Sequence, residues 1–144
     1  MIKSQKIMIG FDGSKYSKKA VKYAINNFSR NSTIYLVYVE EMPAPLYLSN
    51  PSLFIDDSVI KKIREKTKKE LKHQVDIIKK KRFKVKYEYL EGYPPNQIIN
   101  EAKRKNADII VVGSRGMGKW KSSVLGSVSQ TLAVISKIPL LIIK

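Results

Sequence analysis

A glycine-rich stretch near the C-terminus holds the residues of this chain best suited to bind an anion. The β-branched run Ile109–Val112 predicts a buried strand that ends at Gly113. Two residues separate Gly113 from Gly116, and nine residues then separate Gly116 from the pair Gly126–Ser127. A helix is predicted after this pair from apolar residues at helical spacing, Val128, Leu132 and Ile135. Two glycine clusters therefore lie where a strand is followed by a helix.

Phosphate binding is the chemistry that such an arrangement favours. Glycines let backbone N–H groups approach an anion because they carry no Cβ, and the first turn of a helix attracts negative charge. Ser127 and Ser129 add hydroxyl donors there. The alternative is ordinary turn chemistry, since glycine is common in loops. The stretch is neither a Walker loop, because no Gly-Lys-Ser or Gly-Lys-Thr closes it, nor the dinucleotide fingerprint, because its glycines follow the last strand but one.

The elements that must position this loop begin with one strand–helix–strand unit. Ile7–Phe11 is predicted to be a strand that Asp12-Gly13-Ser14 interrupts, and Thr33–Val39 is predicted to be the next. Ser14 suits the N-cap of the helix between them. The apolar face of that helix is Ala20, Val21, Ala24, Ile25 and Phe28. A unit this short implies parallel strands with a right-handed crossover.

The rest of the chain repeats the alternation of strands and helices. A long helix is predicted from a cap at Ser58 to about Lys81, followed by a less buried strand over Val85–Leu90. The buried stripe predicted for that helix is Ile60, Ile63, Thr67, Leu71, Val75 and Ile78. A helix after Pro94 runs to about Lys105, and Leu140–Ile143 is the last strand. The pattern predicts one α/β domain over residues 1–144, with an open parallel sheet covered by helices on both faces.

Several blocks of this chain resemble the universal stress protein family. Gly-x-x-Gly, nine residues and Gly-Ser resemble its nucleotide-binding signature, and Ile7–Ser14 followed by Ser17 and Ala20 resembles its first strand and turn. Asn106–Gly116 resembles its fourth strand and loop, and Ile138–Ile143 its last strand. These blocks keep the family's order over essentially the whole chain. The resemblance implies a Rossmann-like, adenine nucleotide α-hydrolase-like fold with five strands in the order 3-2-1-4-5.

That strand order predicts where a ligand binds. Ligands of open α/β sheets bind beyond the carboxyl ends of the strands, where the strand order reverses. The first and fourth strands are neighbours across this reversal, so Asp12 and the glycine loop are expected to converge. Asp12 suits a hydrogen bond from a ribose hydroxyl or from a metal-bound water. Its alternative role is that of a turn-forming residue before Gly13.

The resemblance implies that the ligand is ATP with Mg²⁺ or Mn²⁺. The glycines and Ser127 match signature positions around the ribose and phosphates, Arg115 and Ser129 flank them, and Val39 matches the position whose backbone reads the adenine edge. The binding residues that we expect are Asp12, Val39, Gly113, Arg115, Gly116, Gly126, Ser127, Val128 and Ser129. No catalytic residue is predicted.

Composition and charge exclude several classes of protein. The chain has no cysteine and one histidine, so disulfides and a structural zinc site are not expected. No apolar run reaches the ~20 residues of a membrane span, and no signal peptide is recognisable, so a cytoplasmic protein is expected. The segment Glu40–Asp57 is a long loop whose apolar residues are expected to pack on a helix, a partner or a ligand.

The net charge of +16 is the least ordinary bulk feature. Thirteen Lys or Arg lie between Lys61 and Lys86, against three acidic residues. Such a surface attracts polyanions without regard to sequence and releases them in salt. The alternative, an ordinary solvated face, is favoured here because no helix-turn-helix, zinc-finger or RNP-type pattern accompanies the lysines.

Three functions remain open at this point. The first is an ATP-binding regulatory switch of the stress response, the second a slow ATPase or adenylyl-transfer enzyme, and the third a nucleic-acid-associated protein. Fast phosphoryl transfer needs a positioned base, and His73 lies on a distant helix, so at most slow hydrolysis is expected. A homodimer through Leu140–Ile143 is also expected, because an apolar strand at a sheet edge invites pairing.

Overall fold

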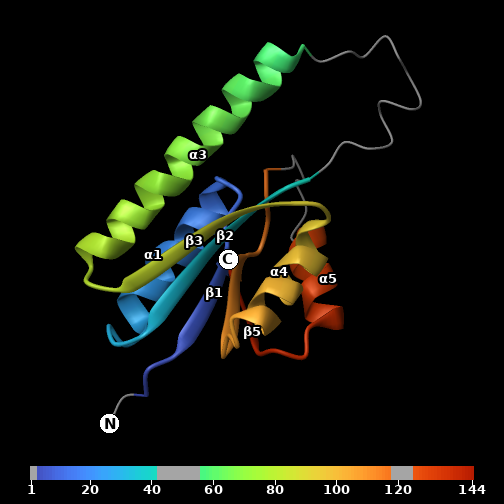
Figure 1. The fold of residues 1–144 in the computed structure, drawn as a ribbon. Coiled ribbons are helices and arrows are strands. Elements are labelled where there is room, and N and C mark those ends of the chain that lie inside the picture. The colour runs from blue at the N-terminus through green and yellow to red at the C-terminus, as the bar shows by residue number, and fades with distance from the viewer. Residues whose placement is uncertain (1–2, 42–55, 118–124) are drawn as a thin grey trace.

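The computed structural model describes residues 3–41, 56–117 and 125–144. Its centre is a five-stranded sheet in which every neighbouring pair is parallel (Figure 1). The strands are β1 (Lys6–Gly10), β2 (Thr33–Glu40), β3 (Lys84–Glu91), β4 (Ile109–Gly113) and β5 (Leu140–Ile143). Their order, β3-β2-β1-β4-β5, confirms the predicted topology and its reversal between β1 and β4.

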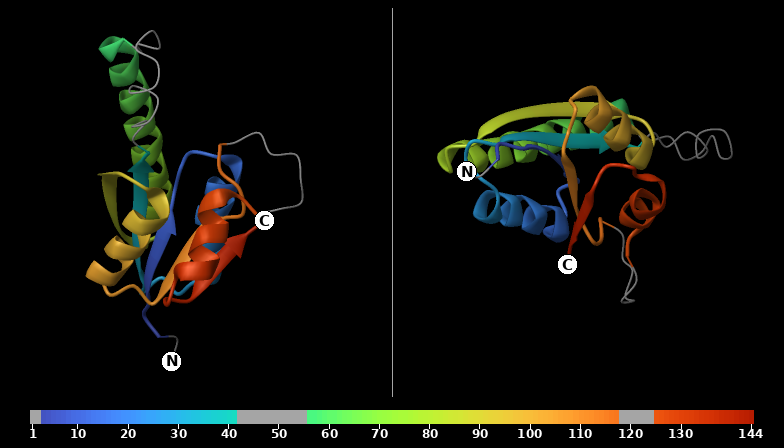
Figure 2. Two further views of the ribbon diagram at one scale, coloured as in Figure 1. Left: turned by 90° about the vertical axis from the view of Figure 1, so that its right-hand side faces the viewer. Right: turned by 90° about the horizontal axis from the view of Figure 1, so that it is seen from below.

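Helices cover both faces of this sheet, as is usual for parallel sheets (Figure 2). They are α1 (Lys15–Asn27), α3 (Asp57–Lys80), α4 (Pro94–Arg104) and α5 (Ser127–Ile135). Helices α1 and α3 pack on one face, and α4 and α5 on the other. No helix within the described ranges is both long and apolar enough to cross a membrane.

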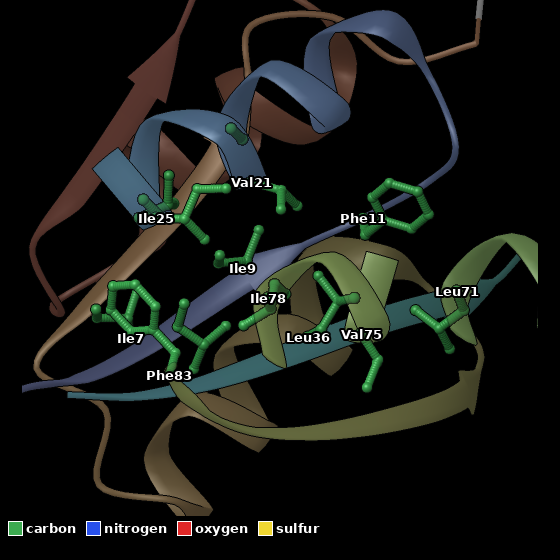
Figure 3. Packing of buried hydrophobic residues seen from close by; sticks show 14 residues of the cluster. Ile7, Ile9, Phe11, Val21, Ile25, Leu36, Leu71, Val75, Ile78 and Phe83 are labelled. Carbon is green, nitrogen blue, oxygen red and sulfur yellow. The ribbon is translucent and has the colours of Figure 1, made fainter. Parts of the chain in front are cut away.

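The short strand β1 separates two hydrophobic clusters. Ile7 and Ile9 face the cluster under α1 and α3, whereas Met8 faces the cluster under α4 and α5. All three side chains have no exposed surface. Figure 3 shows the first cluster, in which side chains from α1 and α3 meet those of β1 and β2. The continuous apolar run of β1 is therefore explained by burial on both faces of the sheet.

Helix starts were predicted with mixed success. Ser14 caps α1 as expected, because its hydroxyl accepts the Ser17 N–H at 3.1 Å. Ser58 does not cap α3; Asp56 does, and its carboxylate accepts the Ser58 N–H at 3.0 Å. The carboxylate precedes the first turn directly, which leaves Ser58 inside the helix. Pro94 occupies the first turn of α4, where proline is favourable.

The predicted buried stripe of α3 holds for only half of the helix. Leu71, Val75 and Ile78 are buried, whereas Ile63 is 58% exposed. Figures 1 and 2 show the reason, since the first half of α3 extends beyond the strands and finds no sheet beneath it. Ile135 of α5, also expected on a buried face, is 43% exposed.

Candidate functional site

The loops after β1 and β4 meet at the carboxyl edge of the sheet. Ile9 of β1 lies beside Val111 of β4, so both strands end at the same level. A Cβ built on Gly116 would lie 2.6 Å from Asp12 Oδ2, which shows that the carboxylate is packed against the glycine backbone. Asp12 and the glycine loop therefore converge, as the strand order predicted.

Asp12 uses one carboxylate oxygen in its own turn. Its Oδ1 accepts the backbone N–H of Ser14 at 2.9 Å, and Gly13 between them has a φ of +83°, where glycine is favoured. The side chain is exposed, and Oδ2 lies beside Gly116. The turn-forming role that the sequence left open is therefore real, and it directs the second oxygen toward the glycine loop.

The glycines of the signature are required for different reasons. A Cβ on Gly113 would lie 2.6 Å from the backbone carbon of Tyr16, so this glycine lets the first turn of α1 approach the end of β4. On Gly116 a Cβ would meet, among the described residues, only the Asp12 side chain within 4 Å. On Gly126 the nearest atom would be the Arg115 Cα at 3.2 Å. Only Gly116 directly borders an acidic side chain.

The carbonyl of Ser114 joins the two glycine clusters. It accepts the Gly126 N–H at 2.6 Å and the Ser129 hydroxyl at 2.9 Å. Ser129 is buried, and its hydroxyl also lies 3.0 Å from the Gly126 carbonyl. The structure thus gives Ser129 a different place from the expected phosphate donor, because its single proton is directed to main-chain carbonyls within the loop.

The start of α5 offers backbone donors to an anion. Gly126 is the N-cap and supplies no side-chain hydrogen bond, and the first turn contains no acidic residue. Ser127 at the first position is exposed, and Val128 is partly buried. A Cβ on Gly126 would lie 3.5 Å from the Gly116 nitrogen, so the N–H groups of this turn and the helix dipole lie close to the loop, where they suit a phosphate group.

Arg115 and Tyr16 form the opposite wall of the loop. The guanidinium carbon of Arg115 lies 5.8 Å from the centroid of the Tyr16 ring, and Lys19 lies 5.4 Å from the same centroid. The Arg115 carbonyl is 3.4 Å from the Ser14 hydroxyl. Sequence reasoning missed Tyr16, and its place in the first turn of α1 gave no signal beyond an aromatic residue at a helix start.

Val39 lies two strands away from the glycine loop on the same edge. It pairs with Leu90 of β3 and is partly buried against the cluster under α4. Among the described residues, no hydrogen bond joins Val39 to Asp12 or to the glycine loop. Its predicted role in reading the adenine edge through its backbone stays a prediction.

A polar cluster beside Val39 perturbs two tyrosines. The rings of Tyr38 and Tyr89 are 5.0 Å apart, and Glu40 accepts two bonds from Arg64 Nε, at 2.9 and 3.1 Å. Burial raises the pKa of Tyr38, with smaller contributions from the charges of Glu40 and Asp12. Burial and the Glu40 charge raise the pKa of Tyr89 to about 12. Both phenols therefore remain protonated at neutral pH.

The side chains at this edge suit a metal ion that arrives with a nucleotide. No group of three or more His, Cys, Asp or Glu able to hold a metal is found among the described residues. Mg²⁺ is commonly held by substrate phosphates together with one or two carboxylates and water. Asp12 is the carboxylate beside the loop, so a metal here would take its other ligands from phosphates and water.

Comparison with known sequences places the chain in a family. The model of the universal stress protein family matches residues 3–144. Universal stress protein MJ0531 of Methanocaldococcus jannaschii is 30% identical over 141 residues, which are 97% of this chain and 82% of the relative. Universal stress protein YxiE of Bacillus subtilis is 30% identical over 145 residues, which cover 96% of this chain and 98% of the relative.

Solved structures share the same fold. Protein MJ0577 of Methanocaldococcus jannaschii superposes with a TM-score of 0.83 at 24% identity, over 97% of this chain and 95% of that one. A family protein of Arabidopsis thaliana with AMP bound has a TM-score of 0.67 at 20% identity, over 97% and 91% of the two chains. A universal stress protein of Archaeoglobus fulgidus in complex with dAMP has a TM-score of 0.64 at 22% identity, over 100% of both. The family model spans nearly the whole chain, and the strand order of the sheet is the one that the resemblance implied. This chain therefore belongs to the universal stress protein family.

Proposed function

We propose that the edge formed by Asp12, the glycine loop and the start of α5 binds ATP together with Mg²⁺ or Mn²⁺. The observation that carries the proposal is the packing of Asp12 Oδ2 against Gly116, beside a helix start that no acidic side chain occupies. An acceptor for ribose hydroxyls and donors for phosphates thus lie next to each other. The AMP and dAMP complexes of the two structural relatives support an adenine nucleotide.

Each part of the nucleotide has a group suited to it. Asp12 Oδ2 accepts a ribose hydroxyl or binds a metal-coordinated water, because Oδ1 is already used by Ser14. The backbone N–H groups of Gly116 and of the Ser127–Ser129 turn donate to phosphate oxygens. Arg115 adds positive charge. The backbone of Val39, at the end of β2, reads the adenine edge.

A regulatory switch fits this site better than an enzyme does. Phosphoryl transfer needs a base or a group that orients water. Glu40 is held by Arg64, His73 is an exposed residue of α3, and Asp12 gives one oxygen to its turn. We therefore propose that bound ATP persists and that its occupancy is the signal. The location of the protein in the cytoplasm stays a prediction.

Nucleotide binding can be tested by thermal shift with ATP, AMP and GTP, each with and without Mg²⁺. A ligand at 100 times its Kd stabilises a fold by about 2.7 kcal/mol. For a domain of this size that corresponds to a rise in Tm of about 5–10 °C. Gly126→Val should abolish the rise because the loop backbone must move, and Ser136→Ala, at the far end of α5, is the matched control. No rise with millimolar adenine nucleotide would contradict the proposal.

A homodimer through β5 is proposed from the exposed edge of the sheet. Within the described part of the chain, strand β5 pairs only with β4, and all four of its apolar residues are partly exposed. The same edge on two copies gives a self-complementary two-fold interface. Sedimentation at micromolar concentration tests the dimer directly.

A further inference from the structure

The lysines of α3 have almost no acidic partners in this protein. Among the described residues, the ion pairs that involve α3 are Arg64 with Glu40 and Glu70 with Lys18. The sequences of 1–2, 42–55 and 118–124 contain no Asp or Glu, so these segments bring no negative side chain. The positive charge of α3 is therefore available to an external anion.

Four of these lysines form one stripe along the helix. Lys61, Lys68, Lys72 and Lys79 are separated by seven, four and seven residues, which places them on one face. All four are exposed. Lys68 Nζ lies 5.3 Å from the centroid of the Tyr89 ring, so this lysine stripe borders the edge strand β3. Figure 1 shows the C-terminal half of α3 beside β3, and the two elements diverge toward the start of the helix.

An exposed tyrosine lies opposite the lysine stripe. Val85 and Tyr89 of β3 face α3, so Tyr87 between them faces the same side, and it is 53% exposed. The chain reverses between α3 and β3. Four helical residues rise about 6 Å and two strand residues about 6.6 Å, so we expect Lys72 to lie near Tyr87, as Lys68 lies near Tyr89.

We propose that the surface between the lysine stripe and Tyr87 binds single-stranded nucleic acid without regard to sequence. A single strand presents a phosphate and a base at each step, and here a helix with exposed lysines packs beside the strand that carries the exposed Tyr87. Lysines neutralise phosphates, and an exposed ring stacks on any base because every base has a π-face. This site is distinct from the nucleotide-binding edge and goes beyond the ATP function proposed above.

An anionic membrane would fit this surface less well. Membrane-bound amphipathic helices place apolar side chains between their flanking lysines. The exposed apolar residues of α3, Val59 and Ile63, lie on the side of the helix away from the lysine stripe, as their spacing shows. Duplex DNA offers phosphates but no free base for Tyr87. The alternation of lysine and tyrosine therefore favours a single strand.

The charge part of the proposal is tested with two matched triple variants of the full chain. Lys68→Gln/Lys72→Gln/Lys79→Gln removes three lysines of the stripe, and Lys62→Gln/Lys69→Gln/Lys80→Gln removes three from the adjoining exposed face of the same helix. Fluorescence anisotropy with labelled dT20 and U20 measures affinity over a range of salt concentrations. The slope of log K against log salt is negative, and the stripe variant should make it shallower by about 2. The control variant should leave the slope nearly unchanged.

The stacking part is tested at Tyr87. Tyr87→Leu keeps apolar area but removes the ring, so it should weaken binding at least about fivefold, whereas Tyr87→Phe should bind like the wild type. Unchanged ATP-induced thermal shifts would show that each variant is folded. Equal losses in the two triple variants would overturn the proposal. Equal affinity for a duplex or for inorganic polyphosphate, or tighter binding to anionic phosphatidylserine vesicles, would overturn it as well.

Discussion

Alanine at Gly113 and alanine at Gly116 should have opposite consequences, although both glycines belong to one signature. At Gly113 the new Cβ would lie 2.6 Å from the Tyr16 backbone carbon and 2.9 Å from the Ser17 nitrogen. Neither atom can move without the first turn of α1. At Gly116 the close atom among the described residues is Asp12 Oδ2, at 2.6 Å, and this exposed side chain can rotate away.

The two variants therefore differ in stability. Overpacking against the backbone costs about 1–3 kcal/mol, so Gly113→Ala should lower Tm by about 3–10 °C. Gly116→Ala has no positive φ to strain, but rotating Asp12 away breaks its hydrogen bond from the Ser14 N–H, so the free energy of unfolding should fall by about 1 kcal/mol or less. Differential scanning calorimetry of the ligand-free proteins measures both changes.

The ranking should reverse for nucleotide affinity, which Gly116→Ala should lower more than Gly113→Ala. If Asp12 accepts a ribose hydroxyl, displacing its carboxylate removes a charged hydrogen bond of about 1.5–3 kcal/mol, which is about a tenfold to 150-fold loss of affinity. Gly116→Ala and Asp12→Ala should lose similar affinity for ATP in calorimetric titration. The double variant should lose no more than either single variant, because both remove one interaction. Additive losses, or a Gly116→Ala Tm as low as that of Gly113→Ala, would refute the reasoning.

Three further outcomes follow from the structure. Because the pKa of Tyr89 is raised to about 12, the folded state favours its protonated form, so its contribution to stability is complete below about pH 10. That contribution is lost as pH rises toward 12, and chemical denaturation of Tyr89→Phe over this range should show a shallower decline than the wild type. Purified protein should retain bound ATP for many minutes, and turnover above about one per minute that Asp12→Asn abolishes would support an enzyme instead. Leu141→Lys should convert a dimer to a monomer in sedimentation with its circular dichroism spectrum unchanged, and a wild-type monomer at micromolar concentration would rule the β5 interface out.

Much of the fold was predictable because apolar strands that alternate with helices are typical of a parallel sheet covered on both faces. The apolar run of β1 is buried on both faces, so alternation with helices was enough to predict a parallel sheet. The order of the strands came from the resemblance. The prediction of a buried stripe along all of α3 was wrong for its first half. Periodicity predicts which side of a helix is apolar, whereas burial of Ile63 depends on whether the sheet extends beneath it.

The site was predictable in place but not in detail. Convergence of Asp12 with the glycine loop follows from where parallel strands end. The distinct roles of Gly113 and Gly116 depend on how closely α1 approaches β4, which no residue spacing encodes. The hydroxyl of Ser129 was expected to face phosphate, but it donates to a carbonyl 15 residues away in the chain, a contact that spacing does not encode. The pairing of Tyr38 with Tyr89 required knowing that β2 and β3 are neighbours in register.

The central position of β1 has a consequence for how the protein is made. Its partner on one side, β2, is synthesised soon afterward, but the Lys6 N–H bonds to Asp108, which is 102 residues further along the chain. A nascent chain therefore carries β1 with one open edge until β4 leaves the ribosome. The same delay applies to Asp12, because its neighbour Gly116 follows β4 in the chain. If the proposed site binds a nucleotide, it can do so only after the start of α5 has also been synthesised.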